Sequence, residues 1–274
     1  NSHKLLDTIN HLSRLYRSLN QLDKAKEYSE RSLNISKRAL GEDHVTTAVA
    51  MGDLGSVYRL RGEHSKAFEL YKKVAEINEA NLEPSHPQMT ISLSRVGDLL
   101  KSMGKYEKAL PFYEKTLKIR ERTLAPGHVS IASALHDLGI LYQLLGRFDT
   151  AKALYDRALK IDQEVFGEKS HEVSEVLSSI GTLLLSQKDT QGAQSYFRQS
   201  LEIKEKIFGE KHTKIVPTLE SIANLHLRDR QPHEAVDCYM RALKINERFY
   251  GPEHFNVKNI LTELGRMYVR RSDK

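Results

Sequence analysis

The sequence has little of several features that would point to a particular chemistry or location. It contains one cysteine, Cys238, which excludes an internal disulfide framework and a zinc site built from several cysteines. No apolar run approaches the roughly 18 residues of a membrane span. The sequence begins with polar residues and shows no secretion signal. These absences predict that the chain has no membrane partner, and they favour a reducing compartment, most simply the cytoplasm.

Sequence signatures of catalysis are also lacking. There is no glycine-rich phosphate loop leading to Gly-Lys-Ser/Thr, no His-Glu-x-x-His and no Gly-x-Ser-x-Gly elbow. A catalytic triad is spatial rather than sequential, so missing motifs alone do not exclude an enzyme. We nevertheless predict that the chain is not an enzyme and that it uses no cofactor.

What the sequence does have is a repeat with a period of 42 residues. Such a period is typical of stacked arrays, in which one unit cannot bury its apolar face alone. Three columns of the repeat are the alanines Ala25, Ala67, Ala109, Ala151, Ala193 and Ala235; the isoleucines Ile35, Ile77, Ile119, Ile161, Ile203 and Ile245; and the small residues Ser13, Gly55, Gly97, Gly139, Gly181, Ala223 and Gly265.

Each repeat predicts two antiparallel helices. In one copy, Leu135, Leu138 and Tyr142 form a first helical stripe, and a second stripe begins at Ala151 after a turn at Gly146. No copy shows the alternation of a strand, so we predict an all-α fold. The small columns allow close helix approach, and bulky residues opposite can fill the space. The aromatic residues proposed for that role are Tyr71, Tyr113, Tyr155, Phe197 and Tyr239.

These residues resemble the tetratricopeptide repeat in its longer form of 42 residues, and the segments 106–113 and 40–44 resemble those of kinesin light chains. The resemblance covers essentially the whole chain. It implies a right-handed α-solenoid of six stacked helix pairs plus a closing helix, forming a single domain over 1–274, which we expect to be a segment of a longer protein. The expected units are 2–40, 41–82, 83–124, 125–166, 167–208 and 209–250, with the closing helix at 251–271.

One departure from kinesin light chains concerns the paired asparagines that commonly precede the small residue of the first helix. This chain instead has pairs such as Gly52-Asp53 and His136-Asp137. The heptad segment of that family is also absent. The cargo recognition of kinesin light chains therefore cannot be transferred to this chain residue by residue.

Two irregular places lead to local expectations. The turn column reads Asn20, Gly62, Gly104, Gly146 and then Lys188 and Arg230, and the last two residue types tolerate a left-handed conformation poorly. We therefore predict that the last two turns differ in geometry from the first four. Pro217 lies one turn into its predicted helix, which predicts a late helix start or a kink.

Histidine recurs at the start of most first helices, but a metal site is disfavoured. Equivalent positions in stacked helices lie about 8–10 Å apart, whereas zinc requires each ligand nitrogen at about 2.0–2.1 Å. We predict instead a polar residue close to unpaired backbone amides. The recurring residues are His44, His86, His128, His212 and His254, with Ser170-His171 in the remaining copy.

In the resemblance, the first helices line a concave wall, so the unpacked stripe of each first helix is the candidate binding surface. Its ends are basic and its middle is polar and neutral. Such a groove suits an extended or helical peptide with acidic residues. The candidate peptide-binding residues are Asn10, Arg14, Arg17, Asp53, Arg59, Arg95, Lys101, His136, Gln143, Asn224, Arg228 and Arg266.

The preferred function is a scaffold or adaptor, possibly for cargo or the cytoskeleton, that binds a peptide segment of a partner. An alternative is a structural spacer that associates with itself inside a multidomain regulator. A nucleic-acid binder is suggested only by the net charge of +6. Such a binder needs a continuous basic stripe, and acids such as Asp53, Asp98 and Asp137 interrupt this one. The sequence leaves the oligomeric state open.

Overall fold

The computed structural model describes residues 2–272, and the side chains of residues 5–267. Within this range the chain is helical and contains no strand, as the sequence predicts. None of the described helices is both long and apolar enough to cross a membrane. The chain consists of two compact units, Asn1–Pro126 and Gly127–Lys274, and their boundary falls close to the predicted end of the third repeat.

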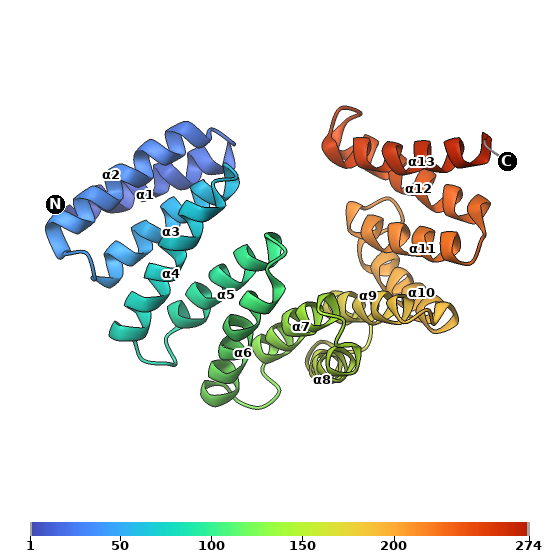
Figure 1. Cartoon of the computed structure of the whole chain (residues 1–274), viewed down its shortest axis with the longest axis horizontal. Coiled ribbons are helices and arrows are strands. Elements are labelled where there is room, and N and C mark those ends of the chain that lie inside the picture. The colour runs from blue at the N-terminus through green and yellow to red at the C-terminus, as the bar shows by residue number, and fades with distance from the viewer. Residues whose placement is uncertain (1, 273–274) are drawn as a thin grey trace. The chain divides into compact units, whose positions relative to one another are not determined.

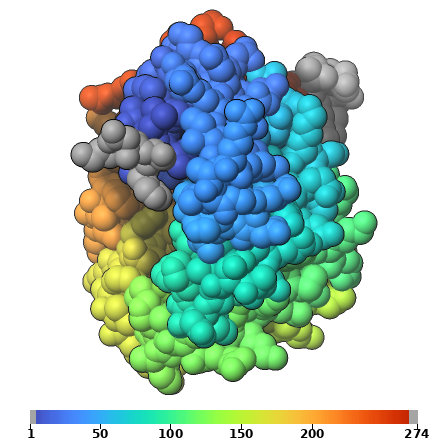
Figure 2. Space-filling model, turned by 90° about the vertical axis from the view of Figure 1, so that its left-hand side faces the viewer, coloured from blue at the N-terminus to red at the C-terminus, as the bar shows by residue number. Residues whose placement is uncertain are grey.

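Unit 1 contains three helical hairpins (Figure 1). The two helices of each hairpin pack against each other, and the second helix of the first two hairpins also packs against the hairpin that follows. In the space-filling view, the surface of the first hairpin, in blue, continues into that of the second, in cyan (Figure 2). The helices are α1 (Ser2–Ser18), α2 (Leu22–Leu40), α3 (Val45–Leu60), α4 (His64–Asn81), α5 (Pro87–Ser102) and α6 (Tyr106–Thr123).

Unit 2 repeats the arrangement with three further hairpins and a last first helix, α13, which packs against α12. Odd-numbered helices are called first helices and even-numbered helices second helices in both units. The elements are α7 (Val129–Leu144), α8 (Phe148–Phe166), α9 (His171–Ser186), α10 (Thr190–Phe208), the 3₁₀ turn η1 (Thr213–Ile215), α11 (Val216–Arg228), α12 (Pro232–Tyr250) and α13 (Phe255–Ser272).

A small residue and an aromatic ring meet inside four of the hairpins, as predicted. A Cβ atom added to Gly55 would lie 2.7 Å from the ring of Tyr71, and one added to Gly139 would lie 2.6 Å from the ring of Tyr155. Gly97 and Gly181 face aromatic rings in the same way. Because an ordinary carbon contact is about 3.5–4.0 Å, a larger residue in the column would collide with the ring.

In the first hairpin, small residues occupy both of these columns. Ser13 stands in the glycine column and Ser29 in the aromatic column, and their Oγ atoms are 2.6 Å apart. Ser13 also donates a hydrogen bond to the carbonyl oxygen of Ala25, at 3.2 Å. The two columns therefore change together, and a buried hydroxyl pair replaces the ring and the space that it needs.

The prediction that the last two turns differ is wrong. Lys188 and Arg230 have φ angles of 69° and 59°, in the same left-handed region as Gly104 at 70°. In each turn, the next residue donates its N–H to a carbonyl five positions earlier, as Asp189 does to Leu184 at 2.9 Å. This bond satisfies an orphan carbonyl at the helix end and closes the hairpin. The hairpin geometry therefore overrides the preference of the side chain.

The other local expectations are confirmed. Pro217 lies in the first turn of α11, which begins late because the 3₁₀ turn η1 replaces its first residues. Four first helices and η1 begin after a histidine whose Nδ1 accepts a backbone N–H two residues later, as His128 does from Ser130 at 3.0 Å. Ser170 caps α9 through its hydroxyl. Cys238 is half-buried and packs against the core of its hairpin.

Candidate functional site

The candidate residues lie on the first helices, and the side of these helices that faces away from the second helix of the same hairpin is called the open side. Buried tyrosines hold several polar side chains of this side in place. The Tyr155 hydroxyl donates to Oε1 of Gln143 at 2.8 Å, and the Tyr239 hydroxyl donates to Oδ1 of Asn224 at 3.1 Å. Tyr71 donates to Ser56 and Tyr113 to Asp98 in the same way. Each ring therefore packs inside the hairpin while its hydroxyl fixes a polar side chain on the open side.

In unit 1, three of the candidate residues form one ion-paired cluster. The Arg14 guanidinium donates to Oδ2 of Asp53 from Nη2 at 3.0 Å and from Nε at 3.2 Å. Arg17 lies 3.7 Å from the other carboxylate oxygen. The Asp53 side chain is only 5% exposed, so its charge is compensated by the two arginines of the neighbouring helix. Asn10, on the same helix, accepts a hydrogen bond from Ser32 at 2.6 Å.

Two further candidate residues of unit 1, Arg59 and Arg95, are not engaged by the protein itself. Neither guanidinium group has a hydrogen bond or an ion pair with a residue in the described part of the chain. Arg95 of α5 lies over α3, where a Cβ atom at Gly52 would approach its Nη1 to 2.6 Å, so the glycine makes room for the guanidinium. Lys101 is 3.6 Å from Asp98 and its ammonium stands over the Tyr113 ring. Among the described basic residues proposed for unit 1, the cationic groups without a partner are therefore those of Arg59 and Arg95.

In unit 2, the predicted residues His136, Arg228 and Arg266 make separate contacts and do not form one cluster. Nε2 of His136 lies 2.7 Å from Oγ of Ser179 on the next first helix. The Arg228 guanidinium donates from Nη1 to the Leu185 carbonyl at 2.6 Å and therefore ties α11 to α9. Arg266 pairs with Glu263 on its own helix.

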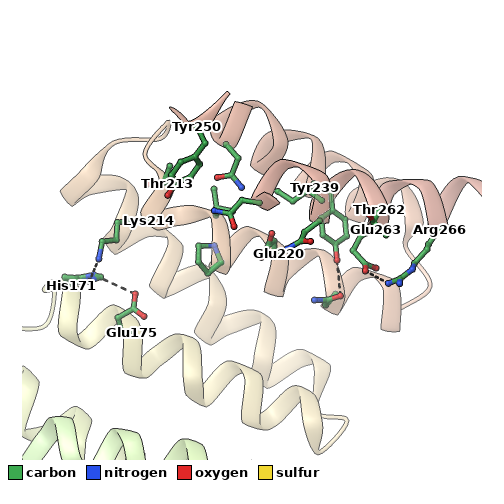
Figure 3. Close-up of a pocket in the computed structure, with 17 residues that line it drawn as sticks. His171, Glu175, Thr213, Lys214, Glu220, Tyr239, Tyr250, Thr262, Glu263 and Arg266 are labelled. Carbon is green, nitrogen blue, oxygen red and sulfur yellow. Dashed lines mark hydrogen bonds and ion pairs between the residues drawn. The ribbon is translucent and has the colours of Figure 1, made fainter. Parts of the chain in front are cut away.

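A pocket of about 1040 Å³ opens between α9, η1, α11, α12 and α13 (Figure 3). Its polar lining includes several side-chain amides and three carboxylates. Two residues that the sequence analysis proposed, Asn224 and Arg266, belong to it. The lining residues are His171, Glu175, Thr213, Lys214, Val216, Pro217, Glu220, Asn224, Tyr239, Asn246, Tyr250, Asn256, Asn259, Ile260, Thr262, Glu263 and Arg266. A second pocket of about 370 Å³ shares Asn224 and includes Arg228.

A buried lysine lies behind the first pocket. Lys204 of α10 is 1% exposed, and its ammonium contacts Oε1 of Glu175 at 2.8 Å and Oγ1 of Thr218 at 3.0 Å. Burial would raise the pKa of Glu175, but the hydrogen bond and charge of Lys204 outweigh it and leave that pKa below its usual value. Burial raises the pKa of Glu220 above its usual value. Burial also raises the pKa of Tyr239 to about 12, so its hydroxyl stays a donor at neutral pH.

Most of the pocket lies outside the residues predicted from the sequence. The predicted residues all come from the unpacked stripe of the first helices, whereas Asn246 and Tyr250 come from a second helix and Thr213 and Lys214 from the 3₁₀ turn. One available signal was Pro217, because the late start of α11 places η1 at the pocket. Among the described residues, no group of three His, Cys, Asp or Glu side chains is arranged to hold a metal ion.

Comparisons with known proteins agree with this architecture. The family model described as tetratricopeptide repeat matches residues 5–80, 88–164, 130–206 and 215–274. These matches and the helical hairpins define an all-α repeat protein. The chain belongs to the tetratricopeptide repeat family. No curated protein sequence matches it significantly.

Solved structures with the same fold include BtubC (BKLC) from P. vanneervenii, at 22% identity and a TM-score of 0.68, covering 84% of this chain and 92% of that one. The apo form of RapI has 17% identity and a TM-score of 0.73, with coverage of 97% and 94%. The nearly identical TPR-like repeats described for a kinesin light chain of Podosopora anserina have 22% identity and a TM-score of 0.67, with coverage of 74% and 96%. At these identities the likeness concerns the fold.

Proposed function

We propose that the chain is a non-catalytic adaptor that binds a peptide segment of a partner protein on the open side of its first helices. The observation that carries the proposal is the pocket of about 1040 Å³, where polar side chains from α9, η1, α11, α12 and α13 converge. The buried Tyr239 holds Asn224 in place before any ligand arrives, which lowers the entropy cost of binding.

On unit 1, the proposal includes a partner segment with acidic residues. Arg59 and Arg95 have no internal partner among the described residues, and a guanidinium fork matches a carboxylate well. Arg14 and Arg17 serve mainly to balance Asp53. Of the basic residues proposed from the sequence, Arg59 and Arg95 are therefore the ones expected to hold the ligand.

The test uses the whole chain and a phage-displayed library of random dodecapeptides, from which binders rich in Asp and Glu are selected and synthesised. We expect the double variant Arg59→Glu/Arg95→Glu to weaken these peptides at least about tenfold, because two attractive contacts become repulsive. The control Arg31→Glu/Arg38→Glu makes the same charge change on exposed positions of α2. Equal loss in both variants, or no loss in either, contradicts the assignment.

One observation favours a second candidate, self-association through α13. The leucine column is buried in the earlier first helices, with Leu93 at 1% and Leu135 at 0% exposure, but Leu261 is 46% exposed. Gly265 also has no atom within 4 Å of an added Cβ, although four glycines of its column each face a ring. Light scattering across concentration tests this candidate: it predicts a dimer that Leu261→Lys converts to a monomer, and a monomeric wild type excludes it.

A further inference from the structure

One carboxylate in the pocket of unit 2 is not balanced by the protein. Glu175 is paired with Lys204, Glu263 with Arg266, and the Lys214 ammonium lies 3.4 Å from Nε2 of His171. Glu220 has no hydrogen bond or ion pair with a residue in the described range, although its side chain is only partly exposed. Figure 3 shows it on α11, among the other lining side chains. A half-buried carboxylate without a cation suits a ligand that brings one.

A second group in the pocket has the same character. Asn246 is 3% exposed and lines the pocket, yet its amide has no hydrogen-bond partner among the described residues. Two equivalent positions in earlier hairpins are satisfied internally, since Asn78 donates from Nδ2 to the Gln88 carbonyl at 3.2 Å and Lys204 binds Thr218. The buried hydroxyl of Ser36, at the same position of the first hairpin, has no partner in the described range. Because the Asn246 side chain lines the pocket and no described residue binds its amide, a ligand in the pocket can bond to it.

The arrangement on α11 sets the spacing of a ligand. Asn224 uses its Oδ1 atom to accept from Tyr239, which leaves its NH₂ group to donate outward. Glu220 and Asn224 are four positions apart, so they are neighbours on one face of the helix with their Cβ atoms about 5–6 Å apart. A single residue of an extended peptide can therefore give its carbonyl to Asn224 and direct a long cationic side chain toward Glu220.

We propose that this pocket binds an extended peptide segment that carries a lysine or arginine, whose cation pairs with Glu220 while Asn224 and Asn246 bond to the peptide backbone. The inference rests on the proposed function and narrows it, because it assigns a basic residue to the ligand of unit 2. Lysine and arginine satisfy the same carboxylate, and arginine adds a planar fork that matches both of its oxygens.

The experiment selects the phage-displayed dodecapeptides against three forms of the whole chain: the wild type, Glu220→Gln and Glu247→Gln. The glutamine at 220 keeps the shape of the side chain and removes its charge, and helix content by circular dichroism confirms folding. Glu247 is an exposed residue of α12 outside the pocket, so its variant is a control for the change in net charge.

We expect wild type and Glu247→Gln to enrich a basic residue at one position of the selected peptides, and Glu220→Gln to lose that enrichment. A synthetic wild-type binder should bind Glu220→Gln about tenfold more weakly, and replacing its basic residue by glutamine should abolish the difference. Enrichment without a basic position, or one unchanged in Glu220→Gln, overturns the inference. If the selected peptides show no Glu220-dependent basic residue but still bind Asn246→Ala more weakly than wild type, the proposed function survives. If no peptide is selected at all, both this inference and the proposed function fail.

Discussion

Units 1 and 2 share their packing columns and differ in the polar column buried at the end of the second helices. The buried residues there are Ser36 and Asn78 in unit 1, 1% and 2% exposed, and Asp162, Lys204 and Asn246 in unit 2, 7%, 1% and 3% exposed. Only unit 2 therefore buries ionisable side chains in this column. The shared columns determine how helices approach each other. The variable column determines which polar and charged groups are buried behind the open side. Asn246 lines the pocket directly, and Lys204 contacts it through Glu175.

The largest expected effect tests the part that the units share. Gly55→Val in unit 1 and Gly139→Val in unit 2 should each lower the free energy of unfolding by about 3 kcal/mol, because the new side chain collides with a buried tyrosine ring. Urea unfolding measures both. Gly265→Ala is the control, since its Cβ meets nothing within 4 Å and should cause no loss. An unchanged free energy of unfolding for Gly139→Val would contradict the close packing of the Tyr155 ring against Gly139.

The next effect tests the part that differs. Lys204→Ala should cost about 2 kcal/mol, because it removes a buried side chain and leaves Glu175 and Thr218 without their partner. The loss stays below that of a fully buried pair because the Glu175 side chain is 45% exposed. Asn78→Ala should cost about 1 kcal/mol, the value of one neutral hydrogen bond. Thermal unfolding of the two variants side by side decides the order, and the reverse order would contradict it.

A pH-dependent effect belongs to Asp162. Burial, followed by the negative charge of Glu172, raises its pKa from 3.8 to about 6. Because the folded state then binds the proton more tightly than the unfolded chain, this residue favours folding fully below about pH 4 and loses that contribution as pH rises through 6. Asp162→Asn should therefore stabilise the chain by about 1–2 kcal/mol at pH 7.

The gain from Asp162→Asn should become small near pH 4, where the carboxyl is protonated in the folded state and about half protonated in the unfolded state. Urea unfolding at pH 4, 5.5 and 7 provides the measurement. Asn78, which already occupies the equivalent position in unit 1, shows that the site accepts an amide. A gain that is the same at all three pH values would show that packing, rather than charge, is responsible.

The smallest effect concerns the turns. Lys188→Gly should stabilise unit 2 by up to about 1 kcal/mol, because a left-handed conformation strains any residue with a Cβ. Gly104→Lys should lose a similar amount in unit 1. A melting temperature measured for each variant suffices, and a destabilised Lys188→Gly would mean that the lysine side chain stabilises its turn.

The repeated columns of the sequence predict the packing inside the hairpins. Gly55, Tyr71 and their repeats are visible in the sequence because packing requires the same residue types every 42 positions. The histidine caps were predictable for the same reason. The turn at Lys188 was not, because hydrogen bonds of the whole hairpin determine its φ angle.

The candidate site shows the same limit. Asn224 and Arg266 were found because they lie on the first-helix stripe. Asn246 and Glu175 were not proposed, because the role of each depends on what a neighbouring helix supplies. Lys204 and Asn246 occupy the same position in successive copies of the repeat. Lys204 is bound by Thr218 and Glu175, whereas Asn246 faces the pocket.

The most direct measurement is photo-cross-linking of the whole chain to a selected dodecapeptide that carries a benzophenone group, followed by mass spectrometry. The account predicts cross-links on residues that line the pocket of unit 2, such as Asn224, Asn256 and Asn259. It also predicts that unlabelled peptide competes them away. Competed cross-links confined to the exposed faces of second helices, at residues such as Lys160 or Arg198, would contradict it.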